Sequence, residues 1–195
     1  MGNCPKNWRV SFDQQKRNMQ SAAIIFLSIA AAIVYGIVHD QITARICVEY
    51  FTIGHPQIFG TNSPTLLGIG WGVVATWWVG LILGVPLAIV SRCGSRPTVT
   101  ARRLIRPILV LLGCMACAAL AAGLAGHMVA SAHVVWLTEP MASLVPSERH
   151  VAFLTDLWAH LASYASGLIG GTILIIWSWR KRSTPNLQGG PNADS

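Results

Sequence analysis

Hydrophobic and polar residues follow one another along the chain in long blocks, as they do in membrane-spanning helices. Four apolar blocks are each about long enough, as a helix, to cross a hydrocarbon layer of about 30 Å. They cover residues 21–38, 66–90, 108–130 and 157–179. The pattern therefore predicts an all-α fold, in which residues 21–182 form a four-helix transmembrane bundle.

The stretch between the first two blocks, His39–Pro56, mixes polar and apolar residues. Read as a helix, it places Gln41, Arg45 and Glu49 on one polar stripe, with aliphatic and aromatic residues around the remaining faces. A glycine and a proline near its end are typical stop signals. We therefore expect a short amphipathic helix that lies across one mouth of the bundle, between the first and second spans.

The composition agrees with a membrane setting. The chain has 195 residues, of which 53% are hydrophobic and 11% are charged, whereas soluble domains carry about 25% charged residues. The net charge of +7 would suit a nucleic-acid ligand, but the cations lie in short flanks beside the apolar blocks. We expect the lipid bilayer as partner and no nucleic acid; other membrane proteins, or a second copy of the chain, are open alternatives.

Lysine and arginine are unequally distributed over the predicted loops. Four precede the first block, five lie between the second and third, and three follow the fourth; only Arg45 and Arg149 fall in the other two loops. The positive-inside rule then places both termini in the cytoplasm, here of a bacterial inner membrane. Residues 1–20 form a basic tail, and residues 183–195 have the composition of a disordered tail.

This topology gathers the titratable residues at the outer side, where all six histidines fall. Ionisable groups at membrane depth are costly, so they normally face the bundle interior or a water-filled cavity. Asp156 and His160 are four residues apart in the fourth block, on one helix face. We therefore expect an outward-facing polar pocket with the following candidate residues: Glu49, His55, His127, Asp156 and His160.

Two interpretations of this pocket stay open. We favour a hydrogen-bonded pair, Asp156 and His160, that orients two helices near the hydrated surface. The alternative is a proton-handling or metal site, the metal held by His127, Asp156 and His160, because imidazole and carboxylate suit zinc, iron or copper. No tightly spaced ligand motif is present. We therefore expect no cofactor, with a metal ion as the alternative.

Small residues recur every four positions in three of the blocks, a pattern that lets helix backbones approach closely. We interpret them as internal packing faces, with homodimerisation as the alternative. They are Gly68 and Gly72, Gly80 and Gly84, Ala119 and Gly123, and Ser163, Gly167 and Gly171.

A C-x-x-C pair, Cys114 and Cys117, lies within the third block. A redox dithiol needs access and a lowered thiol pKa, whereas apolar surroundings raise that pKa. We therefore interpret the two cysteines as small packing residues, with redox chemistry as the alternative.

Three runs, DQITARICVEYFTIGHP, SPTLLGIGWGVVATWWVGLILG and DLWAHLASYASGLIGG, resemble a group of bacterial four-span integral-membrane proteins. The resemblance covers most of residues 40–171 and implies a bacterial inner membrane, but no activity, cofactor or partner. From the residues themselves we expect a non-enzymatic accessory, scaffold or sensor component. A metal-binding or redox enzyme that uses the outer His/Asp cluster, and a small oligomeric transporter, are the alternatives.

Overall fold

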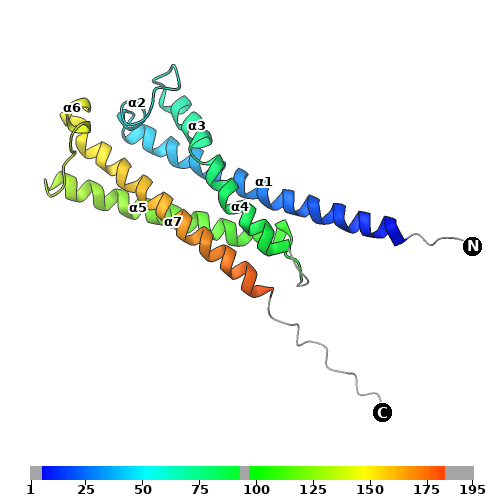
Figure 1. The fold of residues 1–195 in the computed structure, drawn as a ribbon. Helices are drawn as coiled ribbons and strands as arrows, with labels where there is room; N and C mark the ends of the chain where they lie inside the picture. The colour runs from blue at the N-terminus through cyan, green and yellow to red at the C-terminus, as the bar shows by residue number, and fades with distance from the viewer. Residues whose placement is uncertain (1–5, 93–96, 183–195) are drawn as a thin grey trace, which may run out of the picture.

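The regular structure of the chain is helical throughout the part that the computed structural model describes, residues 6–92 and 97–182 (Figure 1). Four helical segments in this part are long and apolar enough to span a membrane, which confirms the predicted all-α class with four candidate spans. They are Gln14–Ile46, Pro64–Arg92, Ala101–Ser131 and Ser147–Lys181. The predicted disordered tail lies outside the described residues.

The first span is one long helix, α1 (Lys6–Ile46), which continues past the predicted end of the apolar block. The predicted amphipathic helix is therefore reduced to a single turn, α2 (Glu49–Thr52). The reason is tertiary packing, since Thr43 and Ala44 in the last turns of α1 are buried. Two polar residues that follow the apolar block, His39 and Asp40, consequently belong to the spanning helix.

The second span is divided into two helices, α3 (Pro64–Val74) and α4 (Trp77–Arg92). The interruption lies at Ala75 and Thr76, where the Thr76 hydroxyl donates to the Gly72 carbonyl at 2.5 Å. Such a bond back to the preceding turn competes with the backbone and bends helices.

The third and fourth spans are α5 (Ala101–Ser131) and α7 (His150–Lys181), joined through the short helix α6 (Met141–Leu144) and the 3₁₀ turn η1 (Ser147–Arg149). Along their lengths, α5 packs on α7, and α1 packs on α3 and α4. The bundle therefore consists of two hairpins, α1 with α3 and α4, and α5 with α7 (Figure 1).

Small residues lie where these helices touch, as predicted. A Cβ atom on Gly72 would lie 2.5 Å from the Cα of Ile37, and one on Gly80 would lie 2.6 Å from the Cα of Ile29. These contacts lie within one chain, so internal packing accounts for the motif. Cys114 and Cys117, by contrast, are exposed on α5. They therefore do not pack inside the bundle, contrary to the interpretation of these cysteines as packing residues.

Among the described residues, two apolar cores form at opposite ends of the bundle. The end that carries α2, which we call the α2 end, holds Phe51, Trp71 and Phe153 among other buried residues. The core at the other end, the termini end, includes Ile24 and Leu104, which are both fully buried. The beginning of α1 and the end of α7 lie at this second end (Figure 1). The space between the two cores is where the hairpins enclose a cavity.

Candidate binding site

A cluster of two histidines and one aspartate joins the two hairpins near the α2 end. His39 and Asp40 come from α1 and His160 comes from α7, and their ligating atoms all lie within 4.8 Å of one another. The Nε2 atom of His160 lies 3.2 Å from the Oδ1 atom of Asp40. Asp40 and His160 are only 5% and 7% exposed, so this contact is made away from water. We call these three residues the His/Asp cluster.

The ring of His160 is oriented by a backbone carbonyl. Its Nδ1 atom lies 2.9 Å from the carbonyl oxygen of Asp156. A carbonyl can only accept, so Nδ1 carries a proton and donates it. The opposite nitrogen, Nε2, faces Asp40 and is free to share a proton with the carboxyl group or to bind a cation.

His39 adds a second imidazole with unused bonding capacity. Its ring meets that of His160 edge-on, with 4.5 Å between the centroids, and stacks on Tyr35 at 5.8 Å. Its Nε2 atom is buried and has no hydrogen-bond partner among the described residues. Buried polar atoms without a partner are rare in folded proteins. The free nitrogen therefore marks this point as a site where a further group can bind.

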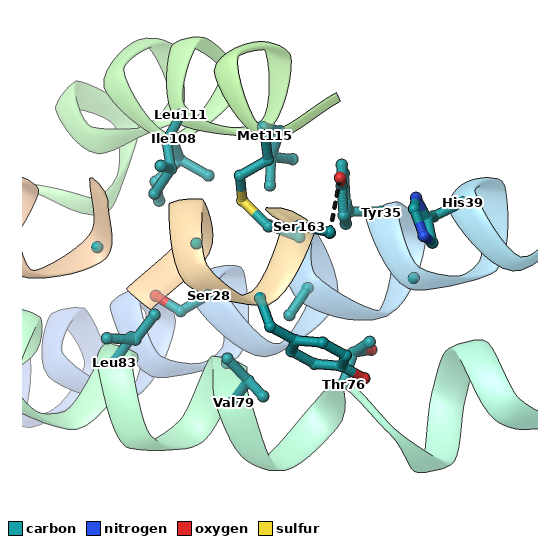
Figure 2. A pocket seen from close by; sticks show the side chains of 18 of the residues that line it. Ser28, Tyr35, His39, Thr76, Val79, Leu83, Ile108, Leu111, Met115 and Ser163 are labelled. Carbon is teal, nitrogen blue, oxygen red and sulfur yellow. Dashed lines mark hydrogen bonds between the residues drawn. The ribbon is translucent and has the colours of Figure 1, made fainter. Parts of the chain in front are cut away.

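The His/Asp cluster forms one end of a cavity of about 100 Å³ between the hairpins. In Figure 2, Ile108, Leu111 and Met115 of α5 lie across the cavity from Val79 and Leu83 of α4. The body of the cavity is therefore aliphatic, and its polar end is built from α1 and α7.

Four hydroxyl groups in the cavity wall, those of Ser28, Tyr35, Thr76 and Ser163, bond within the protein. The Tyr35 and Ser163 hydroxyls lie 2.9 Å apart, a bond that Figure 2 draws as a dashed line. Ser28 donates to the Ile24 carbonyl at 2.9 Å, and Thr76 donates to the Gly72 carbonyl of α3. The His/Asp cluster, in contrast, holds a buried nitrogen of His39 without a hydrogen-bond partner.

Asp156 lies one turn from His160 on α7, towards the α2 end. It is fully buried, and neither of its carboxylate oxygens has a hydrogen-bond partner among the described residues. The contact to His160 uses the Asp156 carbonyl, so the two side chains do not form the expected pair.

Glu49 lies outside the His/Asp cluster, in an ion pair at the α2 end. Its Oε2 atom is 3.0 Å from Nε of Arg149 and accepts from the Cys47 thiol at 3.3 Å. Burial alone would raise the pKa of Glu49, but hydrogen bonds from backbone, Arg149 and Cys47 hold it below its ordinary value. Glu49 thus links α2 to the start of the fourth span through its ion pair with Arg149.

The other two predicted histidines also lie outside the cluster. His55 donates from Nδ1 to the Tyr50 carbonyl at 2.8 Å, and burial lowers its pKa. His127 is exposed on α5, and its Nδ1 atom lies 3.4 Å from the Thr155 hydroxyl. Of the five predicted pocket residues, only His160 belongs to the His/Asp cluster, and Asp156 lies one turn from it on α7.

His39 and Asp40 are not among the residues that the sequence predicts for the pocket. Both follow directly on the first apolar block, so the sequence pattern places them in a separate helix at the mouth of the bundle. One signal could have indicated them: if the first span is extended, they become ionisable groups at membrane depth, which are functional candidates by default.

The fold and this site together define a class: the chain has the fold of a multi-pass membrane protein, with a buried His/Asp cluster at one end of a cavity between two helical hairpins. No protein-family profile, curated protein or solved structure matches the chain. A functional conclusion therefore depends on the site itself.

Proposed function

We propose that this protein is a non-enzymatic sensor or accessory component of a bacterial inner membrane, and that it binds a small amphiphilic ligand in the cavity between its hairpins. The supporting observation is the shape and chemistry of that cavity, which has a largely aliphatic body and a polar end at His39, Asp40 and His160.

The energetic cost of the cavity supports a binding role. Unfilled apolar volume destabilises a protein by about 24 cal/mol per Å³, so a cavity of about 100 Å³ costs on the order of 2 kcal/mol. A bundle that served only as a scaffold would gain this free energy from larger side chains. The small residues Ala31 and Ala32 instead line the cavity, and space is left for a ligand.

The ligand chemistry follows from the distribution of polar atoms. Ser28, Tyr35, Thr76 and Ser163 bond within the protein, so the cavity body favours hydrocarbon. The cluster end would hold an oxygen-bearing head group. A molecule of this kind partitions into the bilayer and can reach a cavity that lies between spanning helices.

The orientation we propose follows from the cations. Both termini lie in the cytoplasm, because the N-terminal tail, the 91–106 loop and the end of α7 carry most of the lysine and arginine. The α2 end and the His/Asp cluster then lie towards the outside. A reporter enzyme that is active only outside the cytoplasm should be inactive when it is fused after Ser195, and activity there would reverse the orientation.

The transporter alternative has less support. It would need a polar path from the cavity to the termini end, and the fully buried side chains of Ile24 and Leu104 are packed into the apolar core at that end. We therefore do not propose transport.

Native mass spectrometry of the purified full chain tests ligand binding. Ala31→Leu adds volume inside the cavity, whereas Ala165→Leu makes the same change on an exposed face of α7. We expect the wild-type protein and the Ala165→Leu variant to retain a bound lipid-phase molecule that the Ala31→Leu variant loses. Absence of any such molecule from the wild-type protein, or equal retention by both variants, would contradict the proposal.

A further inference from the structure

We propose that His39, Asp40 and His160 bind one divalent transition-metal ion, for which zinc is the best match, at the polar end of the cavity. This inference deepens the proposed function. It rests on that function in one respect only, the role of the ion as the attachment point for the ligand head group.

The donor set fits zinc. Two imidazoles and one carboxylate are a common set of three protein ligands, and such sites leave a fourth position for water or a ligand. Zinc bonds of about 2.0–2.2 Å place tetrahedral ligand atoms roughly 3.3 Å apart. The Nε2 atom of His160 and the Oδ1 atom of Asp40 are 3.2 Å apart. All three ligand atoms lie within 4.8 Å of one another, so side-chain movement of about 1 Å closes the site.

The surroundings of the histidines fit metal ligation as well. His160 donates from Nδ1 to the Asp156 carbonyl, and a metal-ligating histidine almost always donates its other ring N–H in this way. The donation leaves the Nε2 lone pair facing Asp40. The second histidine, His39, has a buried nitrogen without a hydrogen-bond partner, which a bound ion would satisfy.

The buried carboxylate of Asp156 accounts for the remaining charge. A divalent ion held by two neutral imidazoles and the Asp40 carboxylate keeps one positive charge, which is costly at membrane depth. Asp156 is fully buried one turn away, with both carboxylate oxygens unpartnered. A negative Asp156 balances that charge, so the occupied site and Asp156 together are neutral.

The open coordination position would face the cavity, because His39, Asp40 and His160 all line it. The oxygen-bearing head group of a lipid-phase ligand could occupy that position while its hydrocarbon part lies among the aliphatic side chains. The chemical class of ligand is thus an amphiphile with a metal-ligating oxygen.

Titration of the full-length, chelator-stripped protein in detergent with Co²⁺, followed by displacement with Zn²⁺, tests the site. Cobalt reports tetrahedral binding through its visible absorption, and elemental analysis gives the stoichiometry. We expect one ion per chain, and an affinity that falls at least about tenfold in His160→Ala and in His39→Gln. Asp156→Asn should weaken binding by about 10–100-fold, as expected of a group next to the ligands.

His127→Ala is the matched control, because His127 is exposed on α5 and lies outside the cluster. It should bind as the wild-type protein does. If His160→Ala fails to fold, His39→Gln decides the question, since His39 is only partly buried. No binding by the wild-type protein, or equal losses in His127→Ala and His39→Gln, would overturn the metal site.

The two proposals fail in distinguishable ways. A protein that binds no metal but retains a lipid-phase molecule sensitive to Ala31→Leu would overturn the metal site and leave the ligand cavity. A protein that binds one ion at the cluster but retains no such molecule would keep the metal site and overturn the proposed ligand.

Discussion

Gly72 lies where α3 crosses α1, and replacement by alanine should separate the two helices. The new Cβ atom would lie 2.5 Å from both the Cα and the N of Ile37 and 2.8 Å from the carbonyl carbon of Gly36. These are backbone atoms, which cannot rotate away, so the helices must move apart by about 1 Å to reach ordinary contact. Overpacking of this kind costs about 1–3 kcal/mol.

Gly113→Ala provides the matched control, because a Cβ atom on Gly113 meets nothing within 4 Å. Alanine favours a helix by about 1 kcal/mol over glycine, and this gain applies to both variants. The difference between them therefore isolates the clash, and we expect Gly72→Ala to be less stable by about 1–3 kcal/mol. Equilibrium unfolding in mixed detergent–SDS micelles, followed by circular dichroism, measures this difference. Equal stability of the two variants would refute the close crossing of α1 and α3.

Three further predictions concern the α2 end. Burial raises the pKa of the Cys47 thiol to about 12, so a maleimide at neutral pH should label Cys47 only after unfolding, and rapid labelling of the folded protein would contradict this. The pKa of Glu49 is lowered from its ordinary value of 4.5, so the ion pair of Glu49 with Arg149 stabilises the folded protein above pH 4.5. This stabilisation is lost as the pH falls through the lowered pKa of Glu49. Arg149→Gln should remove the contribution of the ion pair to this pH-dependent stability, which is at most about 1 kcal/mol because the pair is partly exposed. If the stability of the variant, measured by denaturant titration, falls with acid as that of the wild-type protein does, the pair is contradicted. Burial lowers the pKa of His55 below its ordinary value of 6.5, so the stability that neutral His55 contributes is present above pH 6.5 and is lost as the pH falls through the lowered pKa. His55→Gln should reduce this loss of stability in the same titrations. An unaltered curve would refute the burial of His55 as a neutral group.

The spans could be predicted from the sequence because the bilayer is a uniform solvent that selects long apolar helices. The close helix contacts were also predictable, since small residues at four-residue spacing share one helix face. Gly72 against Ile37 and Gly80 against Ile29 are the contacts that this pattern indicated.

The end of α1 and the membership of the His/Asp cluster could not be obtained in the same way. His39 and Asp40 follow the apolar block, so hydrophobicity ends the span there, but the helix continues and both side chains contact His160 on the other hairpin. The contact of α1 with α7 at the His/Asp cluster is evident only from the tertiary structure. The same limit applies to His127, which remains exposed although it lies on a helix that packs against α7.

The proposed site requires that Asp40 and His160 interact across the two hairpins. A double-mutant cycle with Asp40→Asn and His160→Gln, measured by unfolding of the detergent-solubilised protein in excess chelator, isolates that interaction from metal binding. Contacting residues show coupling energies of about 0.5–3 kcal/mol, and distant ones add within about 0.5 kcal/mol. We predict coupling of at least about 1 kcal/mol for this pair and additivity for Asp40→Asn with His127→Gln. Additivity in the Asp40–His160 cycle would contradict the proposed site.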